Sequence, residues 1–222
     1  MTWAAAITTM ISVAVVGGCE PSRSAANPSP TPDRLVLPSP WRSGGVSLAS
    51  ALASRRSVRA FGARALDDAE LGQLLWAAQG ITDGHRTAPS AGALYPLTLR
   101  VVDARGVWRY APGDHVVIRE LADDRRRQLA DATYAQDAIR SAPVTLVISA
   151  ELAITAARYG GRAERFATLE AGHAAQNVLL TATALGLGAV PVGAFEDEKL
   201  RRALNLAGDV TPLYLIPVGA SR

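Results

Sequence analysis

Apolar residues recur at helical spacing in several stretches of the chain. Asp67 and Glu70 form a capping-box pattern ahead of leucines and alanines spaced three and four apart, which predicts a helix that ends at Gly80. Helical patterns also cover residues 155–166 and 169–187. The second is apolar on nearly all sides, so we expect a central buried helix there. Shorter helices are predicted over residues 47–55, 123–134 and 197–205.

Strand patterns lie between these helices. Runs rich in β-branched and apolar residues predict strands over residues 97–102, 107–110, 144–150 and 213–218, and a turn at 103–106 joins the first two into a hairpin. The helices and strands do not alternate strictly. The pattern therefore favours an α+β layer fold over a doubly wound one.

Composition narrows the class of protein. The 222 residues suit one domain with an additional terminal segment, and 49% hydrophobic against 19% charged residues excludes global disorder. The net charge of +3 rests on 22 arginines and a single lysine, and these alternate with acidic residues instead of forming a stripe. We therefore expect no nucleic-acid partner. The three histidines, His85, His115 and His173, do not have a metal-ligand spacing, so no metal site is predicted.

The N-terminus has the pattern of an export signal. Residues 4–16 form an uncharged apolar run that is too short for a comfortable membrane span, and the only cysteine, Cys19, follows two glycines at its end. This resembles a bacterial lipobox. We predict a lipoprotein-type signal over residues 1–18, lipidation of Cys19 and an exported protein held at a membrane by its lipid alone. Met1-Thr2-Trp3 lacks a basic residue, so an apolar terminus of a cytoplasmic protein is the alternative.

A proline-rich stretch follows the cysteine. Six prolines stand among serine, asparagine and threonine before Gly45, which is typical of an extended, semi-rigid segment. We predict a tether over residues 19–45 and a folded domain over residues 46–222.

Four segments carry the side chains best suited to binding. Arg55-Arg56-Ser57-Val58-Arg59 gathers three guanidinium groups, which can grip a phosphate in bidentate fashion; a solvated charge run is the alternative. Residues 86–96 form a loop of small residues that either admits a flat ligand or merely connects two elements. Gln176 and Asn177 are polar on an apolar helix and should have specific partners. The last segment is the terminal Pro-Val-Gly and Arg222.

Taken in order, these segments resemble the nitroreductase-like flavoprotein family, and most closely its SagB/ThcOx-type dehydrogenase branch. The Arg-Arg-Ser-x-Arg-x-Phe and Pro-Ser-Ala-Gly-Ala-Leu-Tyr-Pro motifs are followed by Glu-x-Gly-His-x-x-Gln-Asn and Pro-Val-Gly. The resemblance covers residues 47–222. It implies an α+β fold with a central antiparallel-rich sheet flanked by helices, an intertwined homodimer and FMN held between the subunits.

The resemblance also implies which residues bind FMN. Those at its phosphate, ribityl chain and pyrimidine edge would be Arg55, Arg56, Ser57 and Arg59, with a further phosphate contact from Arg222. Those that lie against the isoalloxazine ring from the partner subunit would be Pro89, Ser90, Ala91 and Leu94. A backbone contact to the ring would come from Val192 and Gly193.

The implied activity is that of an FMN-dependent oxidoreductase. Hydride would pass through flavin N5 to or from a small organic substrate, with NAD(P)H or another electron donor. Azoline oxidases of the branch use a catalytic Lys-Tyr pair, and the only lysine here, Lys199, does not match it, so no catalytic side chain is named. The alternative is a lipid-anchored binding or scaffold protein that retains the fold.

Overall fold

The computed structural model describes Met1 and residues 33–134 and 136–221. The predicted signal, the lipidation site Cys19, the first part of the tether and Arg222 lie outside the described residues. The described residues from 33 onward belong to one compact unit.

A seven-stranded sheet forms the centre of this unit. Its strand order is β1-β6-β5-β4-β7-β9-β8, and every neighbouring pair is antiparallel. The strands are β1 (Arg34–Val36), β4 (Leu97–Asp103), β5 (Gly106–Ala111), β6 (Val116–Leu121), β7 (Val144–Glu151), β8 (Leu187–Ala189) and β9 (Val210–Ala220). A separate two-stranded hairpin consists of β2 (Ile81–Thr82) and β3 (His85–Arg86). The predicted α+β class and antiparallel sheet are confirmed.

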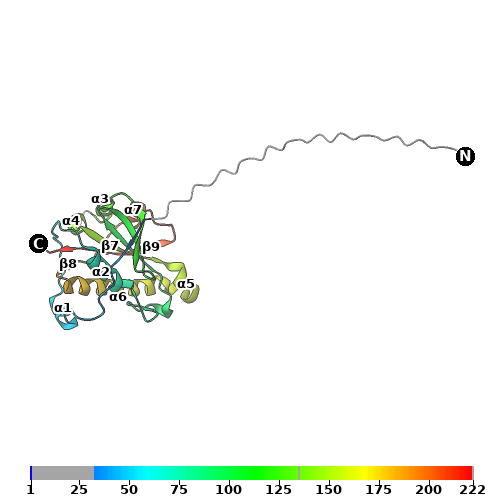
Figure 1. The fold of residues 1–222 in the computed structure, drawn as a ribbon. Coiled ribbons are helices and arrows are strands. Elements are labelled where there is room, and N and C mark those ends of the chain that lie inside the picture. Colours follow the sequence, from blue (N-terminus) through cyan, green and yellow to red (C-terminus); the bar gives the residue numbers. More distant parts are fainter. Residues whose placement is uncertain (2–32, 135, 222) are drawn as a thin grey trace. The chain divides into compact units, whose positions relative to one another are not determined.

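Helices cover both faces of the sheet, as Figure 1 shows. They are α1 (Leu48–Ser54), α2 (Asp68–Gln79), α3 (Arg126–Asp131), α4 (Asp137–Ser141), α5 (Leu152–Tyr159), α6 (Ala163–Ala184) and α7 (Asp197–Leu204). Neighbouring strand residues point to opposite faces. Thus Leu146 joins the core beneath α2 and α6, whereas Val147 joins the core beneath α3, α4 and α7.

The start and end of α2 follow the prediction. The Asp67 carboxylate accepts a hydrogen bond from the Glu70 amide at 2.7 Å, and the Glu70 side chain accepts one from the Asp67 amide at 3.0 Å. Gly80 caps the other end. This reciprocal arrangement satisfies amides that the first helical turn leaves without partners.

Two helix predictions differ from the structure in extent. The break expected near residue 167 lies instead at Gly160, which has a φ of 54° and begins a 3-10 turn, η2 (Gly160–Arg162), so that α6 is one helix of 22 residues. The positive φ of Gly160 therefore decides where the helix breaks, and the change in polarity near residue 167 does not. The helix predicted over 123–134 is reduced to α3, and Tyr134 has a left-handed backbone.

Residues 33–41 form a strap on the domain, which differs from the tether predicted over residues 19–45. Within it, β1 pairs with β6, and Leu37 is buried in the core. The Leu37 amide donates to the His115 carbonyl, and the His115 ring contacts the Pro38 carbonyl oxygen. Leucines alternating at 35 and 37 give this segment the apolar surface that a tether lacks.

Candidate cofactor site

The arginine-rich segment 55–59 runs beside the end of the sheet. It leaves α1 at Arg55 and passes β8, where the Val58 amide donates to the Ala189 carbonyl at 3.1 Å. Phe61 is then buried, and the Gly62 amide donates to the Ala220 carbonyl at 2.8 Å. These backbone bonds anchor the chain between Arg56 and Arg59 and again just after Arg59.

Among the residues that the structure describes, the three guanidinium groups have no acidic partner. Arg55 is half-buried and Arg56 and Arg59 are exposed, and no carboxylate in the described part of the chain lies within 4.0 Å of them. Arg56 Nη1 donates to the Ala53 and Arg55 carbonyls at the end of α1. Ser57 is exposed next to Ala189. The segment is thus equipped to bind an anion in bidentate fashion.

Val192 and Gly193 lie along the same end of the sheet. Val192 is buried, and its amide and carbonyl both pair with Leu215, at 2.8 and 2.9 Å. Gly193 is exposed, so its backbone is accessible to a ligand. The turn between α3 and α4 supports this segment, because Gln136 Nε2 donates to the Ala194 carbonyl at 3.1 Å.

The loop that contains Pro89 and Ser90 has an unusual backbone. It includes a 3-10 turn, η1 (Ala91–Ala93), and φ is positive at Gly92, Ala93 and Tyr95. Ser90 Oγ accepts a hydrogen bond from the Tyr95 amide at 2.9 Å. Pro89 is exposed, while Ser90, Ala91 and Leu94 are half-buried. The loop presents small side chains and backbone on a fixed, strained frame.

A cavity of about 260 Å³ lies between this loop and the start of α6. Its lining residues are Pro89, Ser90, Ala91, Phe166, Leu169, Glu170 and His173. Glu170 is only 2% exposed, and burial raises the pKa of its carboxyl group, while the neighbouring polar side chains of Ser90 and Gln79 act in the opposite direction. The sequence analysis did not single out Glu170 or Gln136 as site residues.

The predicted residues therefore form two groups in one chain. The arginine segment and Val192–Gly193 lie along β8 and β9, whereas Pro89–Leu94 packs on the first half of α6. From Glu170 to Ala184 an α-helix rises about 21 Å, so the groups lie near opposite ends of α6. Figure 1 shows α1, which leads into the arginine segment, near one end of α6 and α5 near the other. Arg222 lies outside the described residues, but its neighbour Ser221 pairs with Phe61.

The expected polar contact within α6 is present. Asn177 Nδ2 donates to the Ala77 carbonyl at 2.9 Å and to the Thr87 carbonyl at 3.4 Å, which ties α2 to the base of the Pro89 loop. Gln176 is exposed. The prediction of a specific contact is thus confirmed for Asn177.

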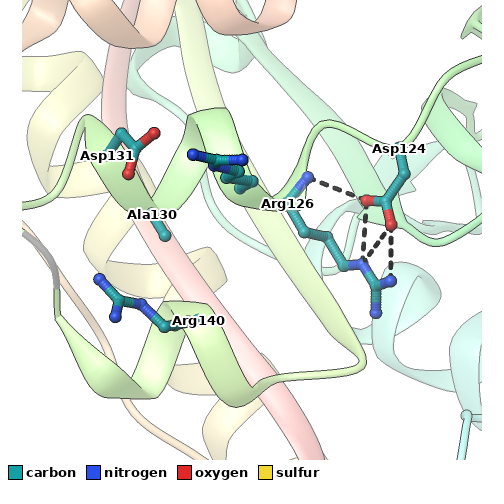
Figure 2. Close-up of a pocket in the computed structure, with 6 residues that line it drawn as sticks. Asp124, Arg126, Ala130, Asp131 and Arg140 are labelled. Carbon is teal, nitrogen blue, oxygen red and sulfur yellow. Dashed lines mark hydrogen bonds and ion pairs between the residues drawn. The ribbon is translucent and has the colours of Figure 1, made fainter.

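A larger hollow of about 540 Å³ lies over α3 and α4 and contains none of the predicted residues (Figure 2). The Arg126 guanidinium is held by Asp124, with Nη2 to Oδ2 at 2.6 Å, and this bond lowers the pKa of the Asp124 carboxyl. Arg127 and Arg140 face the same hollow as Asp131. Its charges therefore largely compensate one another, unlike those of the 55–59 segment.

Two further features are missing from the part of the chain that the structure describes. None of its helices combines the length and the hydropathy that a membrane crossing requires. Its His, Cys, Asp and Glu side chains do not gather in groups of three or more that could hold a metal ion.

Comparisons with known proteins agree with this geometry. A model of the nitroreductase family matches residues 52–220. A protein of Methanocaldococcus jannaschii that is named as a nitroreductase is 43% identical over 183 residues, which cover 78% of this chain and 91% of that protein.

Solved structures give the same picture. One from Ralstonia eutropha, also described as a nitroreductase, is 31% identical, covers 85% of this chain and 90% of its own, and has a TM-score of 0.79. The NADPH:FMN oxidoreductase of Vibrio harveyi, at 21% identity and a TM-score of 0.60, covers 78% of this chain and 68% of its own, and shares the fold.

Proposed function

The chain belongs to the nitroreductase family and is a flavin-dependent oxidoreductase, and we propose that its flavin is FMN, bound at the residues described above. The observation that carries this proposal is the 55–59 segment. Its three guanidinium groups lack acidic partners in the described chain, and the segment is anchored on β8 by the hydrogen bond from the Val58 amide to the Ala189 carbonyl. A phosphate ester is the ligand that such a group of arginines fits best.

The loop cavity fits the other end of the cofactor. Its walls are small or apolar along Pro89, Ala91, Phe166 and Leu169, which suits the flat face of an isoalloxazine ring. When bound, FMN supplies two-electron chemistry by accepting and donating hydride at N5. The chain's own part is to bind and orient the cofactor. The arginines also place positive charge close to it, which favours a reduced, anionic ring.

We further propose that the complete site needs two copies of the chain. Members of this family generally form dimers. The arginine segment and the Pro89 loop lie near opposite ends of α6, so a two-fold axis across this helix would bring the loop of one copy to the arginines of the other. Leu48, Leu52 and Leu169 are large apolar side chains that remain exposed in the single chain, which supports a partner on this side.

Within the family, we propose that the chain belongs to the SagB/ThcOx-type dehydrogenase branch and that it acts on a small organic substrate. The Pro-Ser-Ala-Gly-Ala-Leu-Tyr-Pro loop supports it. The family generally uses a nicotinamide electron donor, and NAD(P)H is the first donor to test.

An absorption spectrum of the purified protein tests the cofactor proposal. We expect the two absorption bands of an oxidised flavin, release of about one FMN per chain on denaturation, and bleaching by a suitable donor under anaerobic conditions. A colourless protein that also fails to take up added FMN would contradict the proposal. It would favour a binding or scaffold role for the fold.

We also propose that Cys19 is lipidated and holds an exported domain at a membrane. The support is the sequence alone, where the only cysteine follows an apolar run and two glycines. The mass of the mature protein tests this. We expect residues 1–18 to be absent and a diacylglyceryl group on Cys19, and we expect Cys19→Ser to retain the signal. A full-length, unmodified product from a bacterium that processes lipoproteins would contradict it.

A further inference from the structure

Arg86 ends β3 and stands where the chain enters the Pro89 loop. Its side chain is half-buried, and no carboxylate in the described part of the chain lies within 4.0 Å of its guanidinium group. A half-buried cation without an ion pair has to be stabilised by other contacts. Two such contacts are present, one with α2 and one with the loop itself.

The first contact is with the C-terminal end of α2. Arg86 Nη1 donates to the carbonyl of Gln79, the last residue of that helix, at 3.1 Å. The last carbonyls of a helix lack partners within the helix and carry partial negative charge, so a cation is favourable there. The next residue adds to this attachment, because the Thr87 amide donates to the Gly80 carbonyl and its hydroxyl donates to the Trp76 carbonyl, both at 2.9 Å.

The second contact is with Tyr95, at the other end of the loop. Arg86 Cζ lies 5.7 Å from the centre of the Tyr95 ring, within the range of a cation–π contact. Tyr95 has a φ of 52°, which is an outlier for a bulky side chain, and it precedes Pro96, although residues before proline are normally extended. A strained backbone of this kind persists only when its surroundings hold it in place.

Tyr95 is thus held at two points. Its amide donates to Ser90 Oγ at 2.9 Å, which ties its backbone to the start of the loop, and Arg86 connects its ring to the end of α2. Ser90 and Ala91, which lie between these two attachments, line the cavity of about 260 Å³. Release of Tyr95 would therefore also release part of the cavity wall.

We infer that Arg86 is a positioning residue, which links the Tyr95 ring to the end of α2 and thereby keeps the Pro89 loop in its strained, cavity-lining conformation. The inference about the loop stands on the hydrogen bond to Gln79 and the contact with the Tyr95 ring. Its consequence for FMN rests on the proposed function, because the same loop lines the cavity offered to the isoalloxazine ring.

Four variants separate this contact from a general effect of charge or packing. Arg86→Met keeps an unbranched side chain and removes both the charge and the donor. Tyr95→Leu removes the ring from the other side, whereas Tyr95→Phe keeps the ring and therefore the contact. Arg109→Met is the matched control, because Arg109 lines the same cavity of about 160 Å³ as Arg86 but is paired with Glu120.

Amide hydrogen exchange in the flavin-free protein tests the inference. We expect Arg86→Met and Tyr95→Leu each to raise the exchange rate of the residue 95 amide, relative to its intrinsic rate, about tenfold, the effect of losing one contact of this kind. Tyr95→Phe and Arg109→Met should stay near wild type. In Tyr95→Leu the further change Arg86→Met should add nothing, because both remove the same contact.

Exchange in β7 distinguishes local loosening from global unfolding, and it should be unchanged. Wild-type exchange at residue 95 in Arg86→Met would overturn the inference, and so would additive effects of the two changes. If Arg86→Met also loosens β7, the decision passes to the pair of variants at residue 95, and equal exchange in Tyr95→Leu and Tyr95→Phe would then overturn it.

FMN titration tests the consequence separately. Arg86→Met and Tyr95→Leu should each weaken FMN binding about tenfold, and Tyr95→Phe should bind like the wild type. Loosened exchange with unchanged affinity would show that the loop conformation does not matter for the cofactor, which would overturn the consequence. If the wild type itself binds no FMN, the proposed function fails, while the exchange data still decide whether Arg86 holds the loop.

Discussion

At the scale of single residues, the charge of the 55–59 segment is the feature most directly open to test. Arg55→Ala or Arg59→Ala should each weaken FMN binding by about 1–3 kcal/mol, the loss expected for a charge-assisted contact. Titration of the apo-protein with FMN, followed by flavin fluorescence, measures this. Arg127→Ala, on the α3 face, is the control for a loss of net charge. Unchanged affinity in both test variants would contradict the phosphate assignment.

The role of a residue was predictable where the residues that act with it lie close by in the sequence. Three arginines within five residues predict an anion site without knowledge of the fold, and an asparagine on an apolar helix predicts a hydrogen-bond partner for its side chain. Glu170 and Gln136 were missed because their partners lie far away in the chain. Glu170 meets Gln79, 91 positions earlier, and Gln136 meets Ala194, 58 positions later. A spacing pattern in the sequence does not reveal such contacts, because they form only when folding brings distant segments together.

His115 gives the fold a specific dependence on pH. Its Nδ1 lies 2.8 Å from the Tyr110 hydroxyl and its Nε2 lies 3.0 Å from the Pro38 carbonyl oxygen. A neutral ring can accept from the first and donate to the second. Burial lowers the pKa of His115, although the Pro38 carbonyl opposes this shift.

Because the folded pKa lies below the unfolded one, the unfolded chain binds the additional proton first as the pH falls. The contribution to stability is therefore complete above the ordinary histidine pKa of about 6.5 and is lost as the pH falls below it. Between about pH 8 and about pH 5, the unfolding free energy measured with urea should fall less in His115→Gln than in the wild type. Equal losses in the two proteins would contradict this role.

At the scale of elements, the strap before α1 has a measurable structural role. Removal of residues 1–45 deletes β1, exposes the edge of β6 and takes the buried Leu37 out of the core. Burial of a leucine side chain alone is worth about 1.5–3 kcal/mol, so unfolding free energy should fall by at least about 2 kcal/mol relative to a chain that begins at residue 33. Equal stability of the two truncated chains would show that the strap does not stabilise the fold and is only a tether.

Helices and strands were predicted correctly where the local sequence pattern is strong. The capping box and Gly80 set the limits of α2, and a largely apolar run rich in β-branched residues identifies β7. The strand β6 was missed, since Arg119 and Glu120 interrupt its apolar run, and it is stabilised by pairing with β5 and β1 on its two edges. The break between α5 and α6 depends on a single left-handed glycine, Gly160.

At the scale of the whole molecule, the separation of the two residue groups along α6 predicts a shared site. If each FMN is bound by the arginines of one copy and the Pro89 loop of the other, two defective chains can complement one another. One chain would carry Arg55→Ala with Arg59→Ala. The other would carry Ala91→Trp, which fills the loop cavity. A mixed dimer then contains one intact site and one doubly defective site.

Co-expression of the two variants should therefore restore FMN binding to about a quarter of all sites, because half of the dimers are mixed and each has one intact site. Each variant expressed alone should bind FMN poorly, and size-exclusion chromatography should show that all of them are dimers. If both groups acted within a single chain, every chain in the mixture would still have one defective half-site, and co-expression would restore nothing. The measurement thus decides between a site within one chain and a site between two, and it does so without knowledge of the substrate or the electron donor.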